Sequence, residues 1–298
     1  MGPTAVGKTS LAMSLYDKMD AELISVDSAL VYRGMDIGTA KPTKEERLKY
    51  PHHLIDICDP AEIYSAAQFS EDATQIIDEI HKKQKTAILV GGTMLYFKAL
   101  IEGFNELPQA DKDVRLKLEK EAEKVGWQTM HETLAKIDPE SGARIHPNDN
   151  QRIQRALEVY QITGKTLTEL QKSQPQKQNA WKLKLVALKP QSRDQLREDI
   201  ALRFQQMLDS GFEHEVRELM KRGDLNTQLP SIRSVGYRQM WQYLAGEMDY
   251  EEMVFRAVTA TRQLAKRQMT WLNGWQDLCW LEASDKNNAN TVLNLLDN

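Results

Sequence analysis

In the first hundred positions, hydrophobic residues recur at helical spacing in some stretches and form short apolar runs in others. This pattern predicts helices separated by short buried strands. In chain order the pattern predicts a helix over 8–19, the strand AELISVDS, a strand at HHLIDI (52–57), a helix over 65–83 and a strand at KTAILVGGT (85–93). Strand, helix, strand at this spacing is typical of a parallel sheet. Because ligands gather beyond the carboxyl ends of parallel strands, we expect a binding site near Asp27 and Thr93.

The middle of the chain has a different pattern. From Asp111 to about Thr168 strand signals vanish and helices dominate, with breaks expected at Gly126, Asp138-Pro139, His146-Pro147 and Gly164. A polar linker, SQPQKQNA, then precedes the apolar stretch WKLKLVAL (181–188), which we expect to return to the sheet. The middle segment therefore reads as a helical insertion over 111–180, set into a catalytic core formed by 1–110 and 181–298.

Helices are predicted over most of the remaining chain, the longest at 197–222 and 251–272. LCWLEA near the end is expected to be a last strand or a docked edge. A chain of 298 residues is longer than a single core comfortably supports, in agreement with one large domain and a smaller one. The predicted class is α/β, a parallel sheet flanked by helices with a small inserted helical domain.

The composition indicates in which compartment the protein is found and what kind of partner it binds. Cys58 and Cys279 lie far apart, with no CxxC pair, which argues against a zinc site or a disulfide framework. No apolar run approaches about 18 residues, so we expect no membrane span and a cytoplasmic protein. The net charge is −4, yet the stretch 255–273 contains four basic residues and no acidic one. This local excess favours a polyanionic partner despite the overall charge.

The strongest single motif opens the chain. GPTAVGKT fits the phosphate-loop pattern GxxxxGK[ST], and the apolar helical run after it is the context that the pattern requires. Loop amides converge on an anion, Lys8 supplies a point charge and the hydroxyl of Thr9 is a ligand for Mg²⁺. A phosphate loop normally follows a buried strand, whereas here Met1 alone precedes it. The motif predicts a P-loop NTPase-like sheet and a polyphosphate ligand held by Gly2, Pro3, Thr4, Ala5, Val6, Gly7, Lys8 and Thr9.

Three polar residues are candidates for the chemistry, each with a simpler alternative. Asp27, at the end of a strand, suits a Mg²⁺ ligand, a general base or a cap for the segment that follows. Thr93 suits an N-cap for the next helix, a role compatible with substrate contact. Arg203 lies on a predicted helix, where a solvated arginine is the simplest interpretation. The residues alone do not decide among these alternatives.

Three basic groups have the composition of RNA contacts. Gln151–Arg155 places Arg152 and Arg155 on one side of a helix, because they are three residues apart. RSVGYR (233–238) combines two arginines with a glycine and a tyrosine able to stack on a base. KRQMTWLN (266–273) adds charge and a tryptophan. Each group alone is more often a solvated face, but three in an acidic chain favour RNA.

Longer strings identify a family. GPTAVGKT, SVDSALVYRGMDIGTAKP, GGTMLYFKAL, RIHPNDNQRIQRALEVY, SIRSVGYRQMW and TRQLAKRQMTWL run in order over nearly the whole chain, and together they resemble the bacterial tRNA dimethylallyltransferase family. The resemblance implies transfer of an isoprenoid from dimethylallyl diphosphate, with Mg²⁺, to N6 of the adenosine just 3′ of the tRNA anticodon. It also implies that the phosphate loop binds the diphosphate of the prenyl donor, although descriptions of the family often call this loop an ATP site. We expect a monomer.

The same resemblance assigns roles to residues. It implies that Asp27 is the base and that Thr93 and Arg203 attend the diphosphate. The expected tRNA contacts are Asp27, Ser28, Ala29, Leu30, Thr93, Arg115, Gln151, Arg152, Ile153, Gln154, Arg155, Arg233, Ser234, Val235, Gly236, Tyr237, Arg238, Lys266, Arg267, Gln268, Met269, Thr270, Trp271, Leu272 and Asn273.

Two other function classes account for parts of the sequence. A phosphate-loop kinase of a small metabolite or nucleotide would use Asp27 for Mg²⁺ or a hydroxyl, and it would consume ATP. An RNA-binding protein with a degenerate loop would bind RNA without turnover, but the intact Lys8 and Thr9 argue against it.

Overall fold

The computed structural model describes residues 1–103, 107–173 and 181–296. The chain folds into two compact units, one formed by Met1–Ile101 with Ala180–Asn298 and the other by Glu102–Asn179. The expected polar linker falls almost entirely outside the described residues. Among the described residues, no helix is both long enough and apolar enough to cross a membrane.

The first unit contains a small parallel sheet, as the strand–helix–strand pattern predicts. Its order is β2-β1-β3, in which β1 (Ala21–Val26) pairs along its whole length with β3 (Thr86–Gly91). The strand expected at 52–57 is shorter than predicted, since β2 covers only His52–His53. The extended backbone ends there because Leu54 has a left-handed φ of 63°. The α/β class is confirmed.

WKLKLVAL does not return to this sheet. Its last residues form β4 (Val186–Lys189), which pairs in parallel with β5 (Cys279–Glu282) as a separate sheet. The backbone of Met1 bonds to β4, since its amine donates to the Val186 carbonyl (2.7 Å) and its carbonyl accepts from the Leu188 amide (2.9 Å). An apolar cavity of about 230 Å³ lies between the facing edges of β3 and β4.

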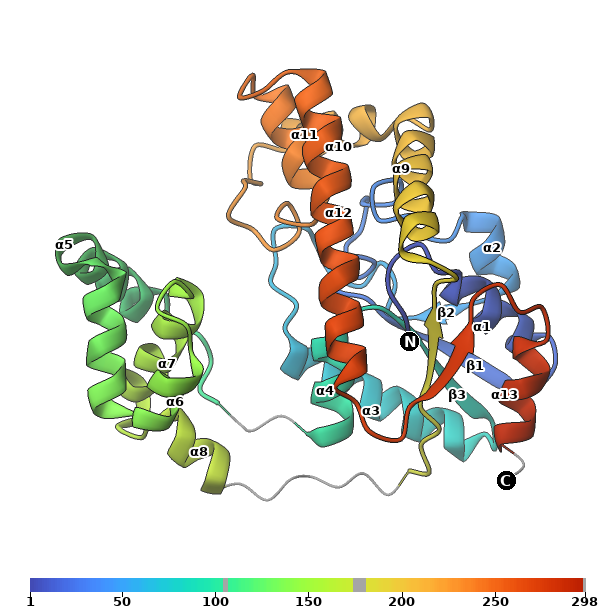
Figure 1. Cartoon of the computed structure of the whole chain (residues 1–298), viewed down its shortest axis with the longest axis horizontal. Coiled ribbons are helices and arrows are strands. Elements are labelled where there is room, and N and C mark those ends of the chain that lie inside the picture. The colour runs from blue at the N-terminus through green and yellow to red at the C-terminus, as the bar shows by residue number, and fades with distance from the viewer. Residues whose placement is uncertain (104–106, 174–180, 297–298) are drawn as a thin grey trace. The chain divides into compact units, whose positions relative to one another are not determined.

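The two faces of β3 pack against different helices, because successive side chains of a strand point to opposite sides. Ala87 and Leu89 join the core formed by α3 (Ala66–Lys82) and α4 (Met94–Glu102). Ile88 joins the core formed by α1 (Lys8–Tyr16) and α13 (Asn288–Leu296). The sheet is therefore covered by helices on both faces (Figure 1).

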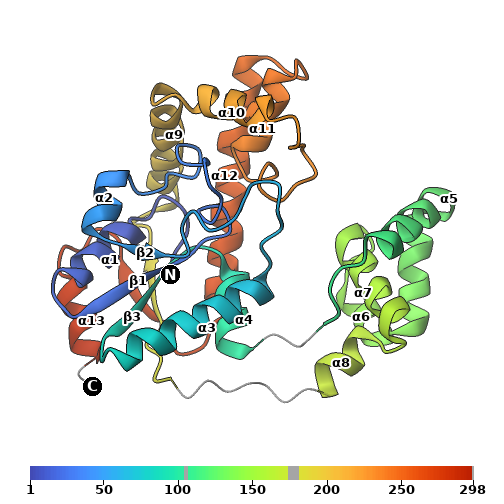
Figure 2. The same cartoon turned by 180° about the vertical axis from the view of Figure 1, so that it is seen from behind.

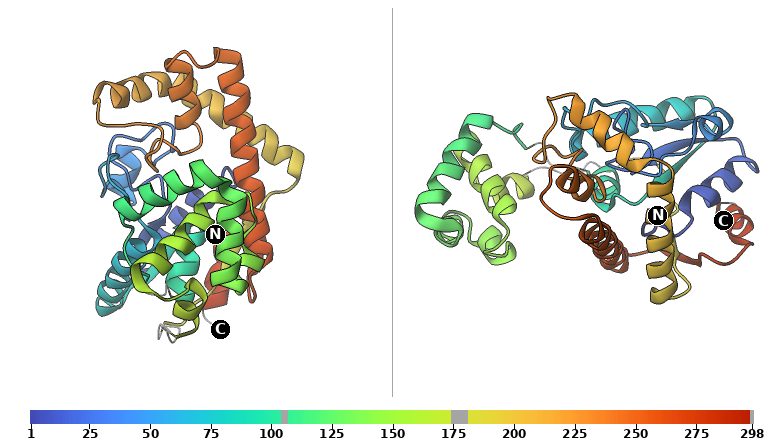
Figure 3. Two further views of the ribbon diagram at one scale, coloured as in Figure 1. Left: turned by 90° about the vertical axis from the view of Figure 1, so that its left-hand side faces the viewer. Right: turned by 90° about the horizontal axis from the view of Figure 1, so that it is seen from above.

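A second group of helices in this unit lies above the sheet in Figure 1 and, from behind, in Figure 2. It consists of α9 (Arg193–Asp209), α10 (Phe212–Lys221), α11 (Tyr237–Leu244) and α12 (Tyr250–Asn273). The single helix predicted over 197–222 is wrong, because Gly211 takes a left-handed φ of 95° that separates α9 from α10. The long helix predicted over 251–272 is confirmed, and α12 runs as one rod (Figure 3, left). A short helix, α2 (Lys44–Lys49), precedes β2.

The second unit is helical within its described residues. It contains α5 (Lys112–Ile137), α6 (Pro139–Arg144), α7 (Asn150–Thr163) and α8 (Leu167–Ser173). All four breaks expected from the sequence are confirmed: α5 is kinked at Gly126, α6 begins after the cap Asp138, His146-Pro147 lies between α6 and α7, and α7 ends at Gly164 with a left-handed φ of 69°. Leu118, Met130 and Ile153 are among the residues of its apolar core.

Candidate active site

One cleft in the first unit collects residues from segments far apart in the sequence. It has a volume of about 800 Å³ and is lined by the phosphate loop, the carboxyl ends of β1 and β3, the segment 38–42, and parts of α9 and α12. Asp27, Thr93 and Arg203 all line it. The three candidates for the chemistry therefore meet at the phosphate loop.

The phosphate loop turns into α1 through Gly7, whose φ of 86° favours glycine. Lys8 begins the helix, and its ammonium donates to the carbonyl of Pro3 at 2.6 Å. Burial lowers the pKa of Lys8 to about 8; the carboxylate of Asp27 raises this pKa and the guanidinium of Arg203 lowers it. Two cations near one carboxylate in a partly buried cleft form a site suited to a polyanion.

Asp27 directly follows β1 and holds the turn that comes after it. Its Oδ1 accepts hydrogen bonds from the backbone amides of Ala29 (2.9 Å) and Leu30 (3.4 Å). Among the described residues, Oδ2 makes no hydrogen bond. One oxygen therefore caps the turn, as one sequence interpretation expected, and this arrangement fixes the carboxylate while the other oxygen stays available.

Thr93 joins the ends of two strands. Its hydroxyl accepts from the amide of Ser28 (3.0 Å) and donates to the hydroxyl of Ser28 (3.3 Å), while its own amide donates to Val26 (3.2 Å). The side chain of Thr93 thus bonds to the segment that follows β1, although the residue also directly precedes α4. These bonds hold Ser28 and Asp27 at the mouth of the cleft.

Arg203 is not a solvated arginine. It is half-buried on α9 and lines the cleft. Burial lowers the pKa of its guanidinium and the nearby carboxylate of Asp27 raises it, although an arginine remains charged at neutral pH. A charge held in a partly dehydrated cleft interacts strongly with a bound anion.

Gln268 ties α12 to the phosphate loop. Its Oε1 accepts from the amide of Thr4 (2.8 Å) and its Nε2 donates to the carbonyl of Gly92 (2.8 Å). The side chain is buried, and a Cβ on Gly92 would lie 2.5 Å from Nε2, so a larger residue at this position would displace the amide of Gln268. The sequence placed Gln268 among the tRNA contacts, whereas the structure places it against the loop.

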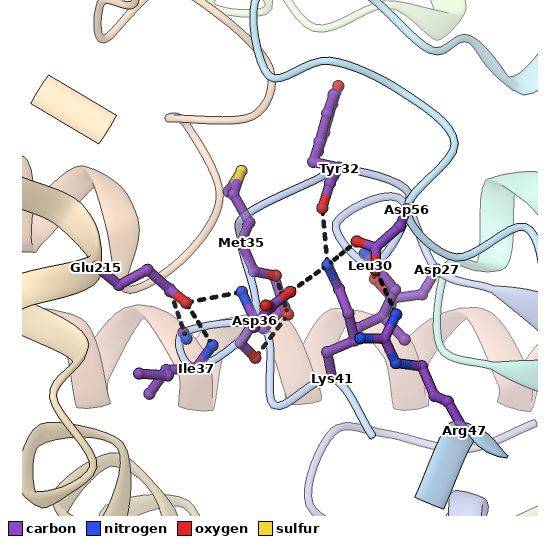
Figure 4. Close-up of polar contacts among 12 residues, drawn as sticks. Asp27, Leu30, Tyr32, Met35, Asp36, Ile37, Lys41, Arg47, Asp56 and Glu215 are labelled. Atoms are coloured by element: carbon purple, nitrogen blue, oxygen red, sulfur yellow. Dashed lines mark hydrogen bonds and ion pairs between the residues drawn. The ribbon is translucent and has the colours of Figure 1, made fainter. Parts of the chain in front are cut away.

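The segment after Asp27 is held by charges that the sequence analysis missed (Figure 4). The carboxylate of Glu215, on α10, accepts from the amides of residues 36–38 at 2.7–3.1 Å and from the hydroxyl of Tyr237 at 2.5 Å. The buried Lys41 ammonium donates to Asp36 (2.7 Å) and Asp56 (2.5 Å). No sequence signal marks Glu215, because it stands among alternating charges typical of a solvated helix face.

The basic group on α7 lies in the second unit and is partly structural. The buried carboxylate of Glu158 accepts from Arg115 (2.9 Å) and Arg155 (2.6 Å). Ile153 is fully buried, so its side chain packs in the core and cannot contact RNA. Arg152 is exposed and pairs with Asp149 at 3.3 Å.

The other two basic groups border the cleft in the first unit. Residues 233–237 line it, as do Arg267, Gln268 and Trp271. Arg233, Arg238, Lys266, Arg267 and Trp271 are exposed, whereas Tyr237 and Leu272 are fully buried. The stacking of a base on Tyr237 expected from the sequence is therefore wrong, because this ring packs between α10 and α11 against Phe212.

Comparison with known proteins identifies the family of the chain. The family model described as IPP transferase matches residues 30–275. A tRNA isopentenylpyrophosphate transferase of Bacillus halodurans is 39% identical, covering 99% of this chain and 93% of its own, with a TM-score of 0.72. The corresponding enzyme of Staphylococcus epidermidis is 34% identical over 100% of this chain and 97% of its own, with a TM-score of 0.70.

A eukaryotic dimethylallyltransferase described as acting on tRNA is 28% identical, covering 99% of this chain and 76% of its own, with a TM-score of 0.80. These matches span nearly the whole chain, and the resemblance found in the sequence strings is confirmed. The chain belongs to the IPP transferase family.

Proposed function

We propose that this enzyme transfers the dimethylallyl group of dimethylallyl diphosphate to N6 of the adenosine just 3′ of the anticodon, in tRNAs that read codons beginning with U, and releases diphosphate. One observation carries the proposal: Asp27, Thr93 and Arg203 line the same cleft as the phosphate loop and the exposed Arg267 of α12. Family membership supports the same reaction.

The phosphate loop and its neighbours suit the donor. Negative charge accumulates on the diphosphate as the bond to the allylic carbon breaks, and donors aimed at that charge lower the barrier. The loop amides, the ammonium of Lys8 and the guanidinium of Arg203 are such donors. Each interaction strengthens toward the transition state, so these residues accelerate the step besides binding the donor.

Asp27 suits the acceptor. The N6 lone pair of adenine is delocalised into the ring, so attack on the allylic carbon requires a base to take the amine proton as the new bond forms. The Ala29 and Leu30 amides orient the carboxylate of Asp27 through Oδ1. We assign the role of base to this carboxylate, which lies in the same cleft as the cationic side chains that bind the leaving diphosphate.

The oxygen atoms in the cleft fit a Mg²⁺ ion. Thr9 offers a hydroxyl, and Mg²⁺ is bound through one or two side-chain oxygens together with substrate phosphates. When bound, the ion would neutralise charge on the departing diphosphate. The described residues contain no cluster of three or more His, Cys, Asp or Glu side chains for a metal, so the diphosphate itself would complete the ligand set.

The RNA partner has to present a base that is normally stacked. Extruding the adenine costs a few kcal/mol, which contacts to the flanking backbone must offset. Arg233, Arg267 and Trp271 border the cleft and are exposed, so they suit these contacts. The anticodon loop is the partner that this arrangement favours.

Salt titration tests the RNA surface of α12. Arg262 and Lys266 are exposed and four residues apart on one face, and neither makes an ion pair with any described residue. Replacing both by glutamine should flatten the slope of log K for tRNA against log salt by about 1 to 2, because fewer phosphates are neutralised. A filter-binding series at several salt concentrations measures the slope.

The matched control replaces Lys182 and Lys184, two exposed lysines that precede β4 and lie outside the cleft. This variant should keep the wild-type slope. Equal slopes for all three proteins would mean that this face of α12 does not contact RNA.

Gln268→Met distinguishes a role of Gln268 in supporting the phosphate loop from a role in binding tRNA. The variant keeps the length of the side chain but removes the bonds to Thr4 and Gly92. We expect KM for the diphosphate donor to rise about 10-fold, because two buried polar groups lose their partners. The affinity for tRNA should stay within about twofold, because the amide faces the loop. Steady-state kinetics and tRNA binding measure both.

Gln206→Met, on the exposed face of α9, is the control for that substitution. The opposite pattern, weaker tRNA binding with an unchanged KM for the donor, would restore the assignment of Gln268 to the RNA surface.

A phosphate-loop kinase is the alternative that uses the same loop. Incubation with labelled dimethylallyl diphosphate or with labelled ATP, each with and without tRNA, separates the two. Label transferred from the prenyl donor to tRNA supports our proposal, and hydrolysis or transfer of the ATP γ-phosphate without prenylation overturns it.

The proposal also includes a monomer in the cytoplasm. The cleft of one chain holds the phosphate loop together with Asp27, Thr93 and Arg203, the residues assigned to the reaction. Cys58 and Cys279 are free thiols, which agrees with a reducing compartment. Size-exclusion chromatography with light scattering tests the monomer.

A further inference from the structure

A second groove lies between α11 and α12, outside the cleft already described. It has a volume of about 370 Å³ and is lined by Arg238, Gln239, Gln242, Phe255, Arg256, Thr259, Ala260 and Gln263. None of these residues lines the cleft of the phosphate loop. Of these residues only Arg238 was expected to contact RNA, so most of the groove has no role in the proposed reaction.

Phe255 is the unusual residue of this groove, because its side chain is 69% exposed. The other residues that line the groove are polar except for Ala260, so within the groove no apolar patch adjoins the ring. An isolated aromatic ring among cationic and amide groups is the composition of a platform on which a nucleobase stacks.

The polar groups of the groove suit a nucleotide rather than a protein side chain. No acidic residue lines it, although Glu251 and Glu252 lie one helical turn before Phe255, and the carboxylate of Glu252 is bound to Arg256 at 2.6 Å. Among the described residues, neither Arg238 nor Gln263 makes a side-chain hydrogen bond or ion pair, so both are available to a ligand. Guanidinium groups bind phosphates, and amides bind the edges of bases.

One row of residues on α12 leads from the groove to the cleft. Arg256, Ala260, Gln263 and Arg267 follow at spacings of four, three and four, which places them in one row on the helix. Arg267 lines the cleft, and Arg256 lies about 16 Å farther along the axis at 1.5 Å per residue. A short single strand of RNA spans such a distance.

We propose that this groove binds a nucleotide flanking the modified adenosine, with its unpaired base stacked on Phe255 and its phosphate held by Arg238 and Arg256. The proposal rests on the proposed function and adds a subsite for single-stranded RNA at the groove. It gives the loop a second anchor beyond the cleft, and that anchor resists withdrawal of the extruded base.

Substitution of Phe255 separates stacking from charge. Phe255→Leu keeps an apolar side chain without a π-face, so tRNA affinity should fall about 10-fold while the slope against salt stays that of the wild type. Phe255→Trp should restore or improve affinity. Arg238→Gln should instead flatten the slope by about 1. Leu48→Ala, an 83% exposed apolar residue on α2, is the matched surface control and should bind tRNA as the wild type does.

Photo-cross-linking tests directly whether a base of the RNA loop lies against Phe255. Anticodon stem-loop RNA with 5-iodouridine in the loop is irradiated with the full-length protein, and we expect a cross-linked peptide that contains Phe255. Wild-type affinity in Phe255→Leu, or cross-links confined to other peptides, would overturn the proposal. Failure of the wild type to prenylate tRNA would instead overturn the proposed function, so the two failures are distinguishable.

Discussion

Lys8→Ala should abolish prenyl transfer, lowering the rate by at least about 10²-fold, while tRNA affinity stays within a few-fold of the wild type. The ammonium lies in the cleft beside Arg203 and faces the charge that develops on the diphosphate, so its loss removes transition-state stabilisation. The arginines that border the cleft are intact in the variant and continue to hold RNA. Single-turnover prenyl transfer and filter binding measure the two effects.

Lys18→Ala is the control, since Lys18 is an exposed lysine that follows the end of α1. Equal losses of tRNA binding and prenyl transfer in Lys8→Ala would contradict the separation of the diphosphate and RNA sites.

The lowered pKa of Lys8 adds a pH signature to the same site. Because the pKa is about 8 in the free enzyme, the ammonium is partly deprotonated at pH 8, and a bound diphosphate favours the charged form. Binding at pH 8 should therefore take up protons, and donor affinity should decrease as the pH rises further. Calorimetry in two buffers of different ionisation enthalpy detects this uptake, which should decrease in Lys8→Ala.

Asp27→Asn should lower the rate of prenyl transfer by about 10²-fold or more, with donor and tRNA still bound. Asparagine keeps an oxygen that accepts from the Ala29 and Leu30 amides, so the turn after β1 survives. What the variant loses is the basicity needed to take the amine proton. Single-turnover rates at saturating substrate isolate this step from binding.

Asp209→Asn, at the last residue of α9, is a control for the same chemical change outside the cleft. A near-normal single-turnover rate in Asp27→Asn would reduce Asp27 to a positioning role through its turn.

Much of this structure could be predicted from local patterns, because these features depend on residues that are close together in the sequence. The glycines and Lys8 of the phosphate loop, the apolar runs that form β1 and β3, and the caps around Asp138 and Gly164 each depend on a few neighbours in the chain. The predicted chemistry followed from the strand ends, which bring Asp27 and Thr93 to one edge of the sheet.

Contacts across long separations were not predictable in the same way. Glu215 binds the backbone of residues about 180 positions earlier, and Gln268 reaches the phosphate loop from the far end of the chain. In both cases the residue type is ordinary for a solvated helix, so neither composition nor period marks it. The prediction for Tyr237 failed for the same reason, because its burial depends on how α10 and α11 pack.

The bonds of Gln268 have a thermodynamic consequence. The same rod, α12, carries exposed arginines on one side and an amide bonded to Thr4 on another, so a displacement of the rod changes both surfaces together. If RNA binding raises the affinity for the diphosphate through this helix, thermodynamic linkage requires that diphosphate binding raise the affinity for RNA by the same factor. Substrate affinities in this enzyme are then properties of the ternary complex, and each should be measured with the other substrate both absent and saturating.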